Sequence, residues 1–206
     1  FAAKIQFIFE IHVNDSKIHK DLPAFCRSVK TRSSRREDFD FAAPRCPTNL
    51  KQKARNMALI VHKYGGTSVG SPERIKNVAK RVAKARAEGH DIVVVVSAMS
   101  GETNRLVALA HEMQEHPDPR ELDVVLATGE QVTIGLLAMA LKDIGVDAKS
   151  YTGWQVALKT DTSHTKARIE SIDDEKMRAD LAEGKVVIVA GFQGISSEGN
   201  ISTLGR

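Results

Sequence analysis

The sequence contains few cysteines, few aromatic residues and no long uninterrupted apolar run. Both cysteines, Cys26 and Cys46, lie in the first quarter of the 206 residues, so there is no disulfide framework and no CxxC pair to hold a metal. No apolar run approaches the roughly 18 residues that span a membrane. With 42% hydrophobic and 27% charged residues, the chain is expected to be a cytoplasmic globular protein with no membrane segment.

Two common nucleotide-binding motifs are also absent. A P-loop needs GxxxxGK followed by Ser or Thr. Gly65 and Gly70 have that separation, but Ser71 and Pro72 follow them. No GxGxxG occurs, which excludes the standard dinucleotide-binding fingerprint. The seven histidines show no metal-ligand spacing, so no metal site built from protein ligands is expected.

The net charge of +4 is unevenly distributed along the chain. Residues 1–56 contain 12 Lys and Arg against 6 Asp and Glu, whereas the remaining residues contain 18 against 20. The basic segment also lacks a sustained helical or alternating apolar period, so we expect an unrelated or disordered N-terminal extension. Three origins for it stay open. They are an artefact or upstream extension with Met57 as the true start, a targeting segment, and a functional basic arm.

Strand-like and helix-like segments alternate from Met57 onward. The segments "ALIVHKY", "DIVVVVSA" and "KVVIVAGF" are predicted to be buried strands, because they are short, apolar and rich in β-branched residues. A helix is predicted to begin at Pro72 with Ser71 as its N-cap, and two more helices follow the second strand. This alternation predicts an α/β fold of three layers, in which helices cover both faces of a mostly parallel sheet.

Polar residues follow each of the three main strands. Because parallel strands end at one edge of a sheet, where ligands bind in open α/β folds, these strand tails are expected to converge there. In the first tail, Gly65 and Gly66 let backbone N–H groups approach an anion, and Lys63 adds a positive charge. The spacing alone fits a phosphate site, and equally a tight turn with a solvated lysine.

Glu130 is the unusual residue of the helix predicted over residues 121–143. It stands beside Gly129 within the apolar segment "LATGEQVTIGLLAMAL", which indicates partial burial. A buried carboxylate requires a partner, and the ammonium group of a substrate would provide one. The alternative is a carboxylate on the protein surface.

Four segments together closely resemble aspartate kinase, a member of the amino-acid kinase superfamily. In chain order they are "KYGGTSVGSPERIKNVA", "VVVSAMSGETNRL", "LATGEQVTIGLLAMAL" and "VIVAGFQGISSEGNISTLGR". The resemblance extends from Met57 to Arg206 and implies the amino-acid kinase fold. It further implies transfer of a phosphoryl group from ATP, bound with Mg²⁺, to the β-carboxylate of L-aspartate. That reaction is the first step toward lysine, threonine and methionine.

The resemblance implies roles for individual residues. Lys63 would be catalytic, because it would neutralise the transferring phosphoryl group, with Tyr64, Gly65 and Gly66 beside it at the nucleotide. Ser97 would contact both the nucleotide and the substrate.

Four further residues would complete the aspartate site. Glu130 would hold the amino group of the substrate, and Arg206 its α-carboxylate. Ser68 and Thr103 would contribute hydroxyl groups. The resemblance also implies a homo-oligomeric enzyme with no nucleic-acid or membrane partner.

The pattern of the family continues past the final "TLGR" of this sequence with a Gly-Gly-Ser-Asp run, the nucleotide-binding half and regulatory domains. We therefore expect residues 57–206 to form the aspartate-binding part of a kinase domain, inactive by itself. Two alternatives stay open. One is another superfamily member, such as a glutamate 5-kinase or acetylglutamate kinase. The other is a non-enzymatic interaction protein that binds nucleic acid through its basic arm.

Overall fold

The computed structural model describes residues 58–205. The predicted extension over residues 1–56 and the candidate ligand residue Arg206 lie outside this range. The described elements are, in chain order, β1 (Leu59–Tyr64), the 3-10 helix η2 (Gly66–Val69), α3 (Pro72–Ala87), β2 (Asp91–Val96), α4 (Glu102–Met113), α5 (Pro119–Asp143), β3 (Ala148–Tyr151), β4 (Lys159–Thr160), β5 (Ile169–Ser171), α6 (Glu175–Ala182), β6 (Val186–Ala190), β7 (Gln193–Ser196) and β8 (Ile201–Thr203).

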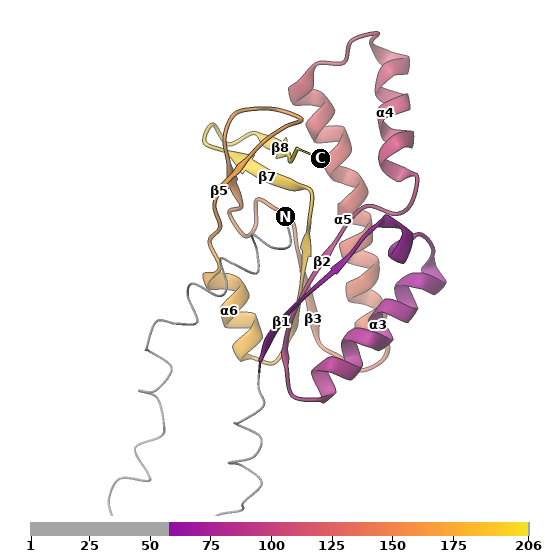
Figure 1. The fold of residues 1–206 in the computed structure, drawn as a ribbon, viewed down its shortest axis with the longest axis vertical. Helices are drawn as coiled ribbons and strands as arrows, with labels where there is room; N and C mark the ends of the chain where they lie inside the picture. Colours follow the sequence, from indigo (N-terminus) through magenta and orange to yellow (C-terminus); the bar gives the residue numbers. More distant parts are fainter. Residues whose placement is uncertain (1–57, 206) are drawn as a thin grey trace, which may run out of the picture.

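Four parallel strands form the main sheet in the order β1-β2-β6-β3. Helices α3 and α5 cover one face, and α6 covers the other (Figure 1). Strands β2 and β6 are the central pair, and their side chains are almost all buried. Residues of β-branched type fit such a pleated, doubly covered surface. The predicted three-layer α/β fold with a mostly parallel sheet is confirmed.

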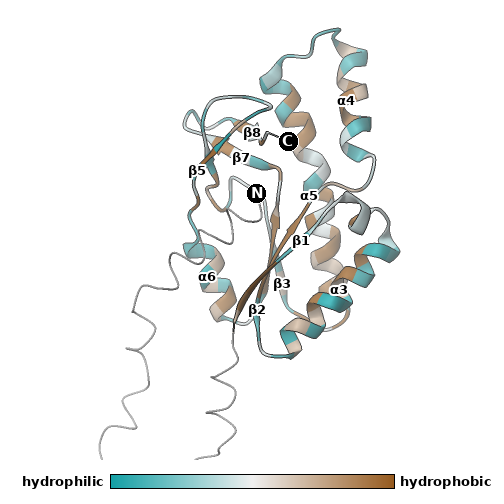
Figure 2. Ribbon diagram, in the orientation of Figure 1, coloured by the Kyte–Doolittle hydropathy of each residue, from teal (hydrophilic) through white to brown (hydrophobic). Residues whose placement is uncertain are grey.

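Alternate residues of the central strands serve two separate cores. Ile92 and Val94 of β2 pack with apolar residues of α3 and α5, whereas Val93 and Val95 pack with residues of α6 and the loop after β3. Successive side chains of a strand point to opposite faces, so one run of valines can fill both layers. Figure 2 shows the strands as a hydrophobic layer between helices whose outer faces are largely hydrophilic.

Helix α3 begins as the sequence predicts. The Ser71 hydroxyl accepts a hydrogen bond from the Arg74 backbone N–H at 3.3 Å, and Pro72 occupies the first turn. A cap of this kind satisfies one of the N–H groups that a helix start leaves free. The apolar positions predicted at helical spacing, Ile75 and Val78 among them, are buried against the sheet.

Helix α5 is long and apolar enough to cross a membrane, but half of its most apolar window is buried inside the protein. Its contacts explain the composition, because it packs against α3, α4 and the main sheet at once. A helix that is apolar on several faces is typical of the interior of a protein as well as of a membrane span. One such helix is weak evidence for insertion in a bilayer.

A second sheet, absent from the sequence-based prediction, extends the fold beyond the ends of the main strands. Its order is β5-β4-β7-β8, with β4 and β7 parallel and the other pairs antiparallel. The chain passes from β6 through Gly191 and Phe192 directly into β7. Gly194 lets β7 approach β4 closely, since a Cβ there would lie 2.7 Å from the Leu158 carbonyl oxygen.

Candidate active site

The carboxyl ends of three main strands meet, as the parallel order requires. The Ser97 N–H donates to the Tyr64 carbonyl at 3.1 Å, and the Gly191 N–H donates to the Val96 carbonyl at 3.0 Å. The polar tails after β1, β2 and β6 therefore lie side by side. Two adjoining cavities open at this edge of the sheet.

The larger cavity has a volume of about 1070 Å³ and combines residues from both sheets. Lys63 of β1, Ser97 after β2 and Gly191 after β6 contribute to its lining. Thr103, at the start of α4, lines the same space. The structure thus brings Lys63, Ser97 and Thr103 together at one cavity.

The smaller cavity has a volume of about 430 Å³ and contains the carboxylate predicted as the substrate ligand. Gly66, Thr67 and Glu130 line it, together with the loop that follows β2. Four residues line both cavities, so the two spaces adjoin one another. These shared residues are Ser97, Thr103, Asn104 and Phe192.

Glu130 is only 1% exposed, and its carboxylate is half satisfied. The Phe192 N–H donates to Glu130 Oε2 at 2.8 Å. The other oxygen, Oε1, is buried and accepts no hydrogen bond of adequate geometry from the described residues, because the nearby Gln193 amide donates to the Ala127 carbonyl instead. Burial raises the pKa of Glu130 to about 8, although the Phe192 N–H and the Gln193 side chain favour the ionised form. A cationic ligand would satisfy Oε1 and compensate for the lost hydration.

The glycine pair after β1 has two different environments. A Cβ on Gly66 would lie 2.9 Å from the Ala98 carbonyl oxygen, so this glycine permits the turn to pack against the end of β2. A Cβ on Gly65 would meet nothing within 4 Å. Arg74 of α3 holds the turn from outside by donating to the Thr67 carbonyl at 2.5 Å. Close packing therefore explains why a glycine stands at position 66, whereas the space around the Gly65 backbone is open.

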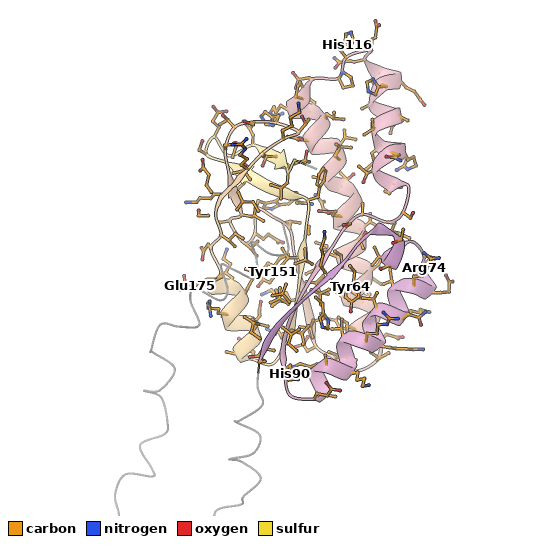
Figure 3. All side chains as sticks on the ribbon, in the orientation of Figure 1. Tyr64, Arg74, His90, His116, Tyr151 and Glu175 are labelled. Atoms are coloured by element: carbon orange, nitrogen blue, oxygen red, sulfur yellow. The ribbon has the colours of Figure 1, made fainter. Side chains whose placement is uncertain are left out.

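Three residues expected to contact ligands line neither cavity. Tyr64 lies between the sheet and α3 (Figure 3), where it packs on the core and its ring contacts His62 edge-on. Ser68 is exposed within η2, and Gly65 precedes that helix. The ligand contacts expected of Tyr64, Gly65 and Ser68 therefore stay predictions, which the lining of these two cavities does not support.

Asp123 is a fully buried carboxylate whose role the sequence did not indicate. It accepts from the Thr165 N–H at 3.1 Å, from His164 Nδ1 at 2.9 Å and from the Thr203 hydroxyl. These bonds join α5 to the loop between β4 and β5 and to β8. Both Thr165 and Thr203 line the larger cavity. Asp123 thus fixes two segments of the cavity wall.

The sequence is similar to that of known proteins. Residues 58–206 match the amino acid kinase family. The chain belongs to that family. An aspartate kinase of Pseudomonas putida is 65% identical over 150 residues, which cover 73% of this chain and 36% of that protein. Aspartokinase 2 of Bacillus subtilis is 54% identical over 150 residues, which cover 73% and 37%. The chain therefore spans about a third of the length of these curated relatives.

Solved structures agree with membership of the amino acid kinase family. Aspartate kinase from Synechocystis superimposes with a TM-score of 0.61 at 46% identity, over 72% of this chain and 24% of that one. Aspartokinase III of E. coli, solved with aspartate and ADP, gives a TM-score of 0.63 over 72% of this chain and 44% of that one. At 22% identity, the second likeness supports the fold alone.

The described residues offer no carboxylate cluster that would suit a magnesium ion. Between residues 58 and 205, no three His, Cys, Asp or Glu side chains are grouped to hold a metal. Glu130 is the one carboxylate that lines either cavity, and one of its oxygens is already bonded to Phe192. Since Mg²⁺ prefers several oxygen ligands, this part of the chain does not fit a magnesium site of its own.

Proposed function

We propose that this chain forms the amino-acid-binding part of an aspartate kinase, which transfers the γ-phosphoryl group of ATP to the β-carboxylate of L-aspartate. The observation that carries the proposal is the buried, half-satisfied carboxylate of Glu130 beside a cavity lined by Lys63. An amino acid needs a negative partner for its ammonium group, and a phosphoryl group needs a positive one. The high identity to aspartate kinases supports aspartate as the substrate.

The two adjoining cavities suit the two charges of this reaction. Phosphoryl transfer to a carboxylate brings two anions together, so catalysis depends mainly on charge neutralisation and positioning. Lys63 would neutralise the transferring group, while Glu130 would bind the ammonium group at the other end of the substrate. Ser97 and Thr103 line both spaces, and their hydroxyl groups would contact the substrate where it passes between them.

No protein nucleophile takes part in this mechanism. The substrate β-carboxylate attacks the γ-phosphorus, the bond to the β-phosphate bridging oxygen breaks, and ADP and an acyl phosphate leave. The magnesium ion of the family reaction would arrive with the nucleotide phosphates, since the described residues form no site for it.

Turnover is proposed to need more sequence than these residues share with the relatives, which are nearly three times as long as the matched segment. The measurement is aspartate-dependent ADP release by the chain as given, compared with the chain extended by the remaining part of the Pseudomonas putida relative. We expect no turnover from the first and turnover from the second. Equal turnover by both would refute the requirement for the additional sequence.

Two substitutions in the active, extended protein separate the proposed roles. Lys63→Ala should lower kcat roughly 100-fold or more, because its charge matters most as negative charge shifts in the transition state. Glu130→Ala should raise KM for aspartate roughly tenfold to a hundredfold, because the ammonium contact already exists in the ground state. Lys80→Ala, which removes an exposed charge from α3, is the control. A Lys63→Ala protein with normal kcat would overturn the assignment of this residue.

A further inference from the structure

Two cations without an assigned role line the larger cavity opposite the sheet. Lys166 and Arg168 belong to the loop between β4 and β5, and they line the same space as Lys63. Neither side chain makes a hydrogen bond or an ion pair within residues 58–205, and both residues are exposed. No acidic residue is among the described lining of this cavity. Three cationic residues therefore contribute to a lining that contains no acidic residue.

The loop that carries these cations is anchored at both ends. Asp123 accepts from the Thr165 N–H, immediately before Lys166. The side chain of Asp161 accepts from the Arg168 N–H at 3.1 Å, and the Asp161 N–H donates back to the Arg168 carbonyl at 3.1 Å. Three backbone groups around the two cations are thus held by carboxylates or by main-chain pairing.

Strand β8 fixes the same loop from its other side. The Ala167 N–H donates to the Thr203 carbonyl at 3.0 Å, and the Gly205 N–H donates to the Ala167 carbonyl at 3.3 Å. Ala167, between the two cations, is buried. The backbone beneath Lys166 and Arg168 is consequently held in place, while both residues are exposed and line the larger cavity.

We propose that Lys166 and Arg168 form a second phosphate-binding element, which acts together with Lys63 on a phosphorylated ligand. A cluster of unpaired cations repels itself unless an anion enters, and a phosphate group can accept from several of them at once. The guanidinium of Arg168 suits two oxygens of one phosphate, and the ammonium of Lys166 provides a compact charge. The class of ligand rests on the proposed function, but the existence of the site does not.

Two ligands of the proposed reaction carry such a group. One is the polyphosphate tail of the nucleotide, and the other is the acyl phosphate product. Tripolyphosphate and acetyl phosphate are probes that carry these two groups without the rest of each ligand. Binding of each probe to the chain can be measured by isothermal titration calorimetry at low ionic strength, where charge interactions are least screened.

The decisive comparison is between two double variants that remove the same charge. Lys166→Ala/Arg168→Ala removes the cavity pair, whereas Lys80→Ala/Lys176→Ala removes two exposed cations from the outer helices α3 and α6. A charge at 4 Å in water is worth about 1 kcal/mol, or about fivefold in affinity. The cavity variant should therefore lose about 25-fold in affinity. The control should lose less than about twofold, because distant surface charges are screened.

The binding results for the two probes show which ligand the Lys166–Arg168 element serves. Loss confined to tripolyphosphate assigns the element to the nucleotide, loss confined to acetyl phosphate assigns it to the product, and loss for both assigns it to the phosphate common to the two. Equal losses in the cavity and control variants, or no binding to the unmodified chain, would overturn the proposal. Phosphate binding that survives while the extended protein shows no aspartate-dependent turnover would refute the proposed function and leave this site intact.

Discussion

The burial of Glu130 predicts how the free energy of unfolding changes with pH, and this prediction does not depend on any ligand. Its carboxyl group is 1% exposed, and burial raises its pKa from the ordinary value of 4.5 to about 8. Without a ligand, the folded protein therefore holds this proton at pH values where the unfolded chain has already released it, whereas a bound ammonium group would favour the ionised carboxylate. Stability linked to this group is complete below about pH 4.5, falls as the pH rises above that value, and stops falling above about pH 8.

The size of the effect follows from the interval between the two pKa values. Each pH unit between them costs about 1.4 kcal/mol of unfolding free energy. Between pH 5 and pH 7 the loss is therefore about 3 kcal/mol, which is large against the total stability of roughly 5–15 kcal/mol for a domain. Glu130→Gln has nearly the same shape and does not titrate, so it should lack this loss.

The assay is urea unfolding of the unmodified chain and of Glu130→Gln at several pH values. All other titrating groups are common to both proteins, so the difference between them isolates Glu130. Glu130→Gln should gain about 3 kcal/mol relative to the unmodified chain between pH 5 and pH 7. A difference that stays constant over this range would show that Glu130 is not protonated in the folded state, and would refute the argument from burial.

Two more predictions concern packing around the site. Gly66→Ala should cost roughly 1–3 kcal/mol, because its Cβ would lie 2.9 Å from the Ala98 carbonyl oxygen, whereas Gly65→Ala, with nothing within 4 Å, should cost less than about 1 kcal/mol. Thermal unfolding measures both, and equal costs would contradict the different environments. Asp123→Ala leaves the partly buried Thr165 N–H and the buried Thr203 hydroxyl without their acceptor and should cost roughly 2–4 kcal/mol in urea unfolding, with a cost under about 1 kcal/mol refuting the anchoring role.

The main sheet was predictable because each of its central strands can be identified from its own short segment of sequence. The valine-rich segments of β2 and β6 are typical of strands that are covered on both faces. The Ser71–Pro72 pair indicated the start of α3. The convergence of the strand tails then followed from parallel order alone. Lys63, Ser97 and Gly191 line one cavity for that reason.

The second sheet could not be predicted in the same way. Strand β4 has two residues and β5 has three, which is too short for an alternating pattern to appear. These strands exist because distant segments pair with them, as in the contact between β4 and β7. The cations at 166 and 168 stood in a polar stretch of ordinary appearance, and only their position over the larger cavity distinguishes them.

The burial of Glu130 was predicted from the sequence, but not all of the apolar residues expected around it lie near it. The apolar neighbours in sequence indicated partial burial, but Met139, nine residues along α5, is 68% exposed. Nine residues correspond to two and a half helical turns, so the two side chains lie on opposite faces. Glu130 instead meets a segment distant in sequence, since its carboxylate accepts a hydrogen bond from the Phe192 N–H and it shares the lining of the smaller cavity with the loop after β2.

The separation of charge across the two cavities is the property that local sequence could not specify. The carboxylate comes from α5, one cation comes from the end of β1, and the other two come from the loop beyond β4. Within its own helix, strand or loop, each charged residue gives no sign of a role at the cavities. Ser97 and Thr103 lie where the two spaces join, so a ligand with an ammonium group at one end and a phosphate at the other would match the charges only in one orientation. Under the proposed function, that directionality would set which carboxylate of an acidic amino acid meets Lys63, because Glu130 would hold the amino group away from it.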